Sequence, residues 1–261
     1  MSMTSTNGMR PFVRKHDNKS STNKWIMEFQ AHHATAQKVI CLPHAGCGAA
    51  AFKTLTGNFF HNRDMVVVQY PGRETRMKDP FVSDMHDLVD DIVQALIPHM
   101  TDPYILFGHS MGSKVAYEVV LRLQVHKERM PDKMVVSCSP APHRPSGLNN
   151  AFQESDDLFL GYLKRLGGVP DELLAIPDLL NMVLPILRAD FELLYRYQAP
   201  ANAEKIKCAL SAIGSAQDVS VRVQDVAHWQ DLCAEKFDLI PVEGGHFYFP
   251  NLNVGMDDLI P

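Results

Sequence analysis

Several features that would define other classes of protein are missing from this chain of 261 residues. It has only five cysteines, an odd number, and no two of them form a C-x-x-C pair. No apolar run approaches the roughly 18 residues needed to span a membrane, and the amino end lacks the apolar core of a signal peptide. These absences predict a cytosolic protein with reduced thiols, no membrane span and no metal site of recognisable ligand spacing.

An excess of positive charge is missing as well. Lysine and arginine together number 25 against 30 acidic residues, a formal net charge of −5, so we expect no nucleic-acid partner. Internal repeats are absent, and the polar, aperiodic residues 1–23 are the only biased segment. We predict a disordered or loosely docked tail there, with an organellar transit peptide as the alternative reading. Residues 24–261 are predicted to form one domain.

What the chain does contain is an alternation of strand-like and helical segments. The strand-like runs are Lys38–Leu42, Met65–Gln69, Tyr104–Phe107, Met134–Val136, Cys208–Ile213 and Phe237–Val242. Trp25–Phe29 is predicted to be an edge strand or an apolar clip onto the body. Alternation of this kind predicts an α/β fold with a mostly parallel central sheet and helices on both faces.

One region breaks the alternation. Between the strands at 134 and 208 the pattern is helical only, and two apolar faces are separated by Gly167-Gly168. We predict that residues 148–203, approximately, form a helical lid above the strand ends, with Pro185 bending its later helix. An ordinary helical layer is the alternative.

The chain is organised around Gly108-His-Ser-Met-Gly112. This G-x-S-x-G motif follows a buried-strand run and opens a helical pattern, which is the context that a nucleophile elbow requires. Glycines on both sides of Ser110 leave room for a sharp, strained turn that lifts the hydroxyl above the sheet. We therefore predict Ser110 as the nucleophile.

A serine nucleophile needs a base and an acid that orients it, in the chain order Ser, Asp or Glu, His. Of the four later histidines, only His246 follows a strand and two glycines, so we predict it as the base. The loop after the strand at 134 has no carboxylate, whereas the loop after the strand at 208 carries Asp218, the predicted acid, with Asp225 as a weaker candidate. The oxyanion donors are predicted to be the backbone N–H groups of Met111 and Ala45.

With these residues in place, the chain resembles the type II thioesterases, an α/β-hydrolase family that serves fatty-acid, polyketide and nonribosomal-peptide synthases. The resemblance rests on five motifs: Pro43-His-Ala-Gly46, Pro71-Gly-Arg-Glu74, Gly108-His-Ser-Met-Gly112, Leu184-Pro-Ile-Leu-Arg-Ala-Asp-Phe191 and Gly244-Gly-His-Phe247. It is most similar to the animal branch, the oleoyl-ACP hydrolases or medium-chain S-acyl fatty acid synthase thioesterases. Two departures are an extra residue before Asp218 and Cys47 in place of a common glycine.

The resemblance implies hydrolysis of acyl thioesters on the phosphopantetheine arm of an acyl carrier protein, with release of medium-chain fatty acids, by a monomer without a cofactor. Editing of misprimed polyketide or peptide synthases and general carboxylesterase activity remain alternatives, as does a non-catalytic receptor. Because carrier proteins are acidic, docking is expected on a basic patch. The candidates are Arg73, Arg76 and Lys78, or Lys164 and Arg165. Acyl chain length depends on lid packing and is left open.

Overall fold

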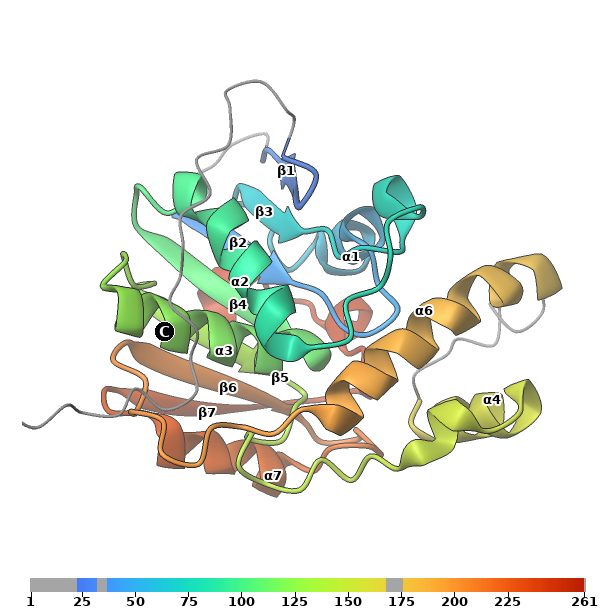
Figure 1. Ribbon diagram of the computed structural model, residues 1–261. Helices are drawn as coiled ribbons and strands as arrows, with labels where there is room; N and C mark the ends of the chain where they lie inside the picture. The colour runs from blue at the N-terminus through green and yellow to red at the C-terminus, as the bar shows by residue number, and fades with distance from the viewer. Residues whose placement is uncertain (1–22, 32–36, 168–175, 261) are drawn as a thin grey trace, which may run out of the picture.

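The computed structural model describes residues 23–31, 37–167 and 176–260 (Figure 1). Of the predicted tail, residues 1–22 lie outside the described part of the chain.

A seven-stranded sheet runs through the described residues in the order β1-β3-β2-β4-β5-β6-β7. The strands are β1 (Ile26–Phe29), β2 (Lys38–Leu42), β3 (Met65–Val68), β4 (Tyr104–His109), β5 (Lys133–Ser137), β6 (Ala209–Ser215) and β7 (Phe237–Val242). Only the edge strand β1 is antiparallel to its neighbour, and every other pairing is parallel. The predicted mostly parallel α/β sheet is therefore confirmed, and the apolar run at 25–29 supplies its edge strand.

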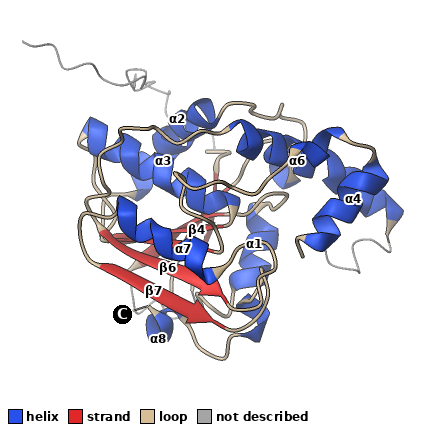
Figure 2. Cartoon of the chain, turned by 90° about the horizontal axis from the view of Figure 1, so that it is seen from below, coloured by secondary structure: helices blue, strands red, loops and turns tan. Residues whose placement is uncertain are grey.

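Helices cover both faces of this sheet (Figures 1 and 2). The α-helices are α1 (Ala49–Thr56), α2 (Met85–Leu96), α3 (Met111–His126), α4 (Asp156–Arg165), α6 (Pro177–Arg196), α7 (Val223–Ala227) and α8 (Met256–Leu259). Short 3₁₀ turns are η1 (Glu74–Arg76), η2 (Ile97–His99), η3 (Asn150–Gln153), η4 (His228–Leu232) and η5 (Phe249–Asn251). The arrangement is that of an α/β-hydrolase.

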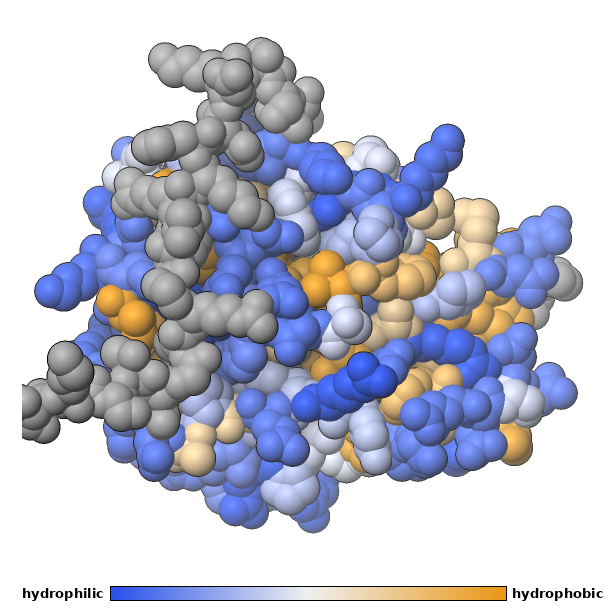
Figure 3. All heavy atoms as spheres, viewed as in Figure 1, coloured by the Kyte–Doolittle hydropathy of each residue, from blue (hydrophilic) through white to orange (hydrophobic). Residues whose placement is uncertain are grey.

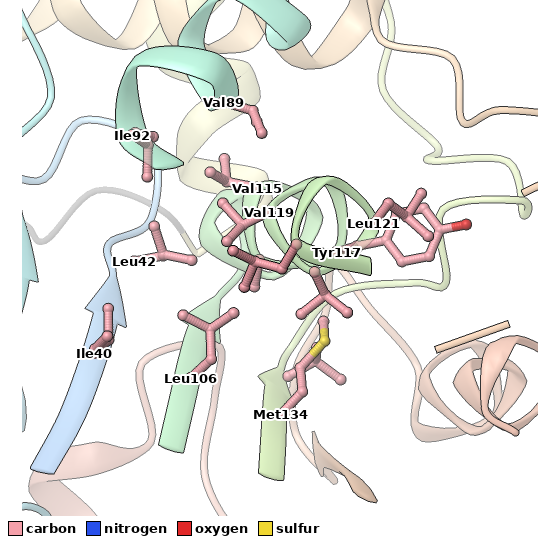
Figure 4. Close-up of a cluster of buried hydrophobic side chains, with 14 of the residues drawn as sticks. Ile40, Leu42, Val89, Ile92, Leu106, Val115, Tyr117, Val119, Leu121 and Met134 are labelled. Carbon is pink, nitrogen blue, oxygen red and sulfur yellow. The ribbon is translucent and has the colours of Figure 1, made fainter. Parts of the chain in front are cut away.

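The alternation of side chains along each strand builds two cores, one on each face. Ile40 and Leu42 of β2 point toward α2 and α3, where Val115 and Val119 pack against them and Leu106 (Figure 4). The intervening residues of the same strands face the other way, toward α1, η5 and α8. Burying both faces requires near-continuous apolar strands, which is why these runs could be recognised in the sequence.

In the described part of the segment between β5 and β6, the structure has η3, α4 and α6 and no strand. Residues 168–175, which include Gly168 of the predicted lid, lie outside the described part of the chain. Helices α4 and α6 pack together through a separate apolar cluster that includes Phe159, Leu163 and Leu187. They project beyond one end of the sheet, and apolar side chains line the surface between them (Figures 1 and 3). Gly167, at φ +68°, follows α4, and α6 continues through Pro185 without a break in the helix. None of the described helices combines the length and apolarity that crossing a bilayer would require.

Candidate active site

Ser110 lies in the turn between β4 and α3. Its backbone is at φ 54° and ψ −115°, in the left-handed region that non-glycine residues rarely adopt. The Ser110 N–H donates to the Ser137 carbonyl at 2.8 Å, which ties the turn to the end of β5. Strain of this kind persists only where surrounding contacts impose it, and it concentrates at functional sites.

The two glycines of the motif are required by space. A Cβ atom on Gly108 would lie 2.3 Å from the carbonyl oxygen of Gly112, and one on Gly112 would lie 1.9 Å from the carbonyl oxygen of Leu42. Both neighbours are backbone atoms that cannot move aside. The sequence-based explanation for these glycines, crowding of the turn, is confirmed.

The loops after β6 and β7 bring Asp218 and His246 together. The Nδ1–H group of His246 donates to Asp218 Oδ2 at 2.7 Å, although 28 residues separate the two in the chain. The Asp218 side chain is fully buried, while that of His246 keeps a 10% exposed fraction. A hydrogen bond on Nδ1 leaves Nε2 as the free proton acceptor of a neutral imidazole.

Three donors hold the second oxygen of Asp218. The Ser220 N–H, the Ser220 hydroxyl and the Val221 N–H donate to Oδ1 at 2.8, 2.6 and 3.1 Å. Burial would raise the pKa of Asp218, but the bonds from His246 and Ser220 outweigh it and lower that pKa below its ordinary value. Ser220 Oγ also lies 3.1 Å from His246 Nδ1. Sequence reasoning missed Ser220; its position two residues after the acid was the only available signal.

Ala45 lies on the loop after β2, and a buried ion pair supports that loop. The next amide, Gly46 N–H, donates to Asp190 Oδ2 at 2.7 Å. Asp190 in turn accepts two bonds from Arg73, at 2.6 and 2.8 Å, and the two side chains are only 6% and 4% exposed. Thus two motifs of the sequence meet here, because Arg73 belongs to Pro71–Glu74 and Asp190 to Leu184–Phe191. No pattern in the sequence indicated this contact.

The neighbouring Glu74 holds the start of α1. At φ 45° it turns its carboxylate back to accept from Ala50 N–H and Ala51 N–H, each at 3.0 Å. A Cβ atom on Gly48 would lie 2.2 Å from that carboxyl carbon. These contacts satisfy helix N–H groups that would otherwise lack partners and fix the far end of the loop that carries Ala45.

Two further histidines lie beside the site and are kept neutral. Burial is the main cause that lowers the pKa of His44 to about 3 and that of His109 well below its ordinary value. His109 Nδ1 lies 3.0 Å from Ser137 Oγ, which lies 2.9 Å from the Tyr248 hydroxyl. His109 is thereby fixed as a packing residue under His246, whose ring centroid is 5.2 Å away.

Ser110, His246, Ala45 and Met111 all line a single cavity of about 130 Å³. The rest of its wall is mainly apolar and is contributed largely by the helices between β5 and β6, with Tyr162, Leu163, Leu166, Leu187, Phe191 and Leu194 as lining residues. Asp218 contacts His246 Nδ1 and does not line the cavity. Asp225, the weaker candidate for the acid, instead pairs with Arg222 at 2.8 Å.

One predicted docking patch, Arg73, Arg76 and Lys78, is wrong at its two arginines, and only Lys78 is exposed. Arg73 and Arg76 are 3% and 5% exposed; Arg73 pairs with Asp190, and Arg76 stacks on the Trp25 ring at 3.8 Å and pairs with Asp79 at 2.8 Å. Both guanidinium groups are used inside the protein. The sequence could not reveal this because Asp190, the partner of Arg73, and Trp25, the ring under Arg76, come from distant segments.

Cys47 is buried, and its thiol donates to the Gly48 carbonyl at 3.3 Å. Burial raises the pKa of this thiol far above its ordinary value, which disfavours the reactive thiolate and argues against an oxidisable site. All five cysteines are free and buried. Two groups of potential metal donors lie within the described residues: Cys138 with Asp218 and His246, and the half-buried His228 with the exposed His143 and Asp231. The first belongs to the site above; the second is a hydrogen-bonded cluster in which both histidines share one Asp231 oxygen.

Comparison with known proteins agrees with the α/β-hydrolase fold described above. The profile of the thioesterase domain family matches residues 37–254. A probable cadicidin biosynthesis thioesterase of Streptomyces griseus is 31% identical over 225 residues, which cover 86% of this chain and 62% of that protein. The medium-chain S-acyl fatty acid synthase thioesterase of Rattus norvegicus is 32% identical over 219 residues, 81% of each chain.

Solved structures agree. The type II thioesterase BorB from the borrelidin biosynthetic cluster superposes with a TM-score of 0.72 at 28% identity, covering 89% of this chain and 92% of BorB. The fold and the elbow define an α/β-hydrolase. Within that class, the chain belongs to the thioesterase family and is related to the type II thioesterases.

Proposed function

We propose that this protein is a serine thioesterase that hydrolyses acyl thioesters on the phosphopantetheine arm of an acyl carrier protein or domain. One observation carries the proposal: Ser110 and His246 open into the same apolar-walled cavity, and His246 is oriented by its 2.7 Å bond to the buried Asp218. Membership of the thioesterase family supports the thioester as the bond that is broken.

The proposed reaction is acyl transfer in two steps. His246 Nε2 accepts the proton of Ser110 as the hydroxyl oxygen attacks the thioester carbonyl, and Asp218 stabilises the imidazolium that forms. The N–H groups of Met111 and Ala45 bind the oxyanion, helped by the positive end of α3. The thiol then leaves with the proton from His246. Water, deprotonated by His246, attacks the acyl-enzyme and releases the acid.

For the acyl group, we propose medium-chain fatty acids as the first candidate product, in keeping with the rat relative. The second candidate is editing of short acyl groups on a biosynthetic assembly line. Its specific support is the cavity volume of about 130 Å³, since an engineered cavity of roughly 150 Å³ holds a molecule the size of benzene. Relatives with names from antibiotic biosynthesis point the same way.

The test is hydrolysis of carrier-bound acyl thioesters from acetyl to octadecanoyl, beside oxygen esters of matched length. We expect Ser110→Ala to lower kcat by roughly 10⁴-fold or more. A maximum at medium chain lengths supports fatty-acid release, and a maximum at acetyl or propionyl supports editing. Faster hydrolysis of oxygen esters than of thioesters would make the protein a general esterase, and undiminished activity in the variant would reject Ser110 as nucleophile.

A further inference from the structure

Lys114 is a buried cation beside the proposed nucleophile. It lies in the first turn of α3, four residues after Ser110, so the two Cα atoms are about 6 Å apart along the helix axis. The residue is 6% exposed, and it lines the same cavity as Ser110 and His246. A lysine in this place puts a positive charge within side-chain reach of the acyl group.

No carboxylate of the protein neutralises this charge within the described part of the chain. None lies within 4.0 Å of Lys114 Nζ, and burial alone lowers the pKa of the ammonium group to about 8. Glu118, one turn further along α3, is directed elsewhere: its Oε1 accepts from the Tyr197 hydroxyl at 2.7 Å. A buried lysine without an acid is costly to the fold, and such a cost is typical of sites that bind a charged ligand.

Lys114 also lines a second cavity, whose wall is more polar than that of the first. The second cavity, of about 360 Å³, adjoins the first, and Lys114, Ser146 and Leu194 line both. The second cavity is also lined by His143 and Arg144. Lys114 therefore lies where the mainly apolar cavity adjoins a second cavity lined by basic side chains.

We propose that Lys114 binds an anionic oxygen group of the substrate, so that the enzyme accepts acyl chains that end in a carboxylate. This inference rests on the proposed thioesterase function and specifies its substrate class. A carboxylate on the acyl group would reach past the apolar wall to the ammonium and Arg144, while its thioester carbonyl lies against Ser110. Inside a protein, where the effective dielectric constant is lower than in water, a charge-assisted hydrogen bond is stronger than in water.

A second possible source of the anion is the phosphate of the phosphopantetheine arm. That phosphate is separated from the thioester sulfur by two amide groups and their linkers. The distance from Ser110 to Lys114 is one helical turn, which suits a group a few bonds from the reacting carbonyl better than the end of the arm. The acyl carboxylate is therefore the assigned source.

Two measurements test this. In the first, non-hydrolysable thioether analogues of succinyl- and glutaryl-pantetheine are titrated into the protein beside neutral analogues of equal length, each with and without the 4′-phosphate. In the second, kcat/KM is measured for succinyl, glutaryl, pentanoyl and hexanoyl thioesters. The proteins are the wild type, Lys114→Met and a surface control, Lys205→Met, whose lysine is exposed on the loop before β6.

We expect the wild type and Lys205→Met to bind the carboxylate analogues about tenfold or more tightly than the neutral ones, and Lys114→Met to lose that ratio. The kcat/KM ratio should fall in parallel. Equal affinity of the wild type for the carboxylate and the neutral analogues would overturn the inference. This outcome is informative whether or not the protein hydrolyses thioesters, because binding of the analogues does not require the Ser110 hydroxyl. Loss of affinity in Lys114→Met only for phosphate-bearing analogues, charged or neutral, would also overturn it and assign the phosphate instead. Absence of hydrolysis despite selective binding would reject the proposed function alone.

Discussion

Ser220 adds a fourth side chain to the proposed catalytic group. Its hydroxyl donates to Asp218 Oδ1 at 2.6 Å and lies 3.1 Å from His246 Nδ1. It thus contacts both members of the Asp–His pair without touching the position of the reacting carbonyl. We regard it as a positioning residue that keeps the carboxylate charged and the imidazole in one orientation.

We predict that Ser220→Ala lowers kcat about tenfold, because a hydrogen bond to a charged group is worth roughly 1.5–3 kcal/mol. KM should change little. Removal of this bond should also raise the pKa of Asp218, so protonation of the carboxylate, which would cost His246 its orienting hydrogen bond, should begin at a higher pH. Measurement of kcat across a series of pH values checks this prediction. Ser215→Ala is unsuitable as a control, because the Ser215 hydroxyl donates to the Gly244 carbonyl near His246. Unchanged kcat and an unchanged profile would assign Ser220 to packing.

The burial of Lys114 also leads to a prediction about the free energy of unfolding. The pKa of this lysine falls from 10.5 to about 8 in the folded protein, which costs ~3 kcal/mol at neutral pH. Between pH 8 and 10.5 the unfolded chain holds more protons than the folded one, so wild-type stability should rise with pH across that window. Lys114→Met should therefore raise the melting temperature by several degrees at pH 7, and the gain should vanish toward pH 10.5. Calorimetry at several pH values measures this, and a variant that melts lower at pH 7 would contradict it.

Among the elements, α6 links the proposed lid to the proposed oxyanion loop. Asp190 of this helix accepts from Gly46 N–H, one residue after Ala45, and is neutralised by Arg73. The position of the Ala45 amide therefore depends on where α6 packs. The helix also ends at a buried contact, Tyr197 to Glu118 of α3, so both ends of its second half are attached to the body.

We predict that Asp190→Asn lowers the free energy of unfolding by about 3–5 kcal/mol, because it leaves the buried Arg73 without a counter-charge. The kcat of the folded fraction should fall as well, since the Ala45 amide loses its support. Denaturant unfolding and kinetics of the purified variant provide the measurements. The matched control is Glu192→Gln on the same helix, which breaks a largely exposed pair with Arg196 and should cost under about 1 kcal/mol. Equal effects of both substitutions would refute the linkage.

At the scale of the whole molecule, binding of an acidic carrier depends on local patches of positive charge rather than on the net charge. The chain carries a net charge of −5, which would repel an acidic carrier at long range. With Arg73 and Arg76 buried, the remaining predicted patch is Lys164 and Arg165, both exposed at the end of α4 beside the cavity. This places the candidate docking surface on the lid rather than on the body of the sheet.

We predict that Lys164→Glu with Arg165→Glu raises KM for an acyl carrier protein several-fold and leaves that for acyl-pantetheine within twofold, because only the carrier presents an acidic surface. The effect should shrink at high salt. A control pair, Lys205→Glu with Lys207→Glu, reverses two exposed charges before β6, at the end of the sheet away from Ser110. Loss of affinity for both substrates, or the same loss in the control, would exclude α4 as the docking surface.

How much of this could be read from the sequence depends on the range of the interaction involved. The strands were predictable because burial on both faces requires unbroken apolar runs such as Met65–Val68. The elbow was predictable because the steric need for glycine at 108 and 112 arises within one turn and its neighbour. The order of Ser110, Asp218 and His246 followed from the family pattern, and the structure brings the last two into contact.

Interactions between distant segments were beyond the sequence. Arg73 and Asp190 are 117 residues apart, and nothing local marks them as partners rather than as surface charges. The same holds for Ser220 with His246, 26 residues further along the chain, because the Ser220 hydroxyl reaches the imidazole only once two loops have met. For this reason the prediction of Arg73 and Arg76 as docking residues, made from charge, was wrong.

The sequence by itself determined the class of fold and the elbow, since these depend on periodicity and local sterics, and the known chain order of hydrolase triads predicted the proposed catalytic residues. The tertiary structure alone decided which charges are buried, which helix supports the Ala45 loop, and that Lys114 faces two cavities without an acid. The physical reason is that the free energy of a charge depends on its solvation and on its neighbours in space. Neither can be inferred from the order of the residues alone.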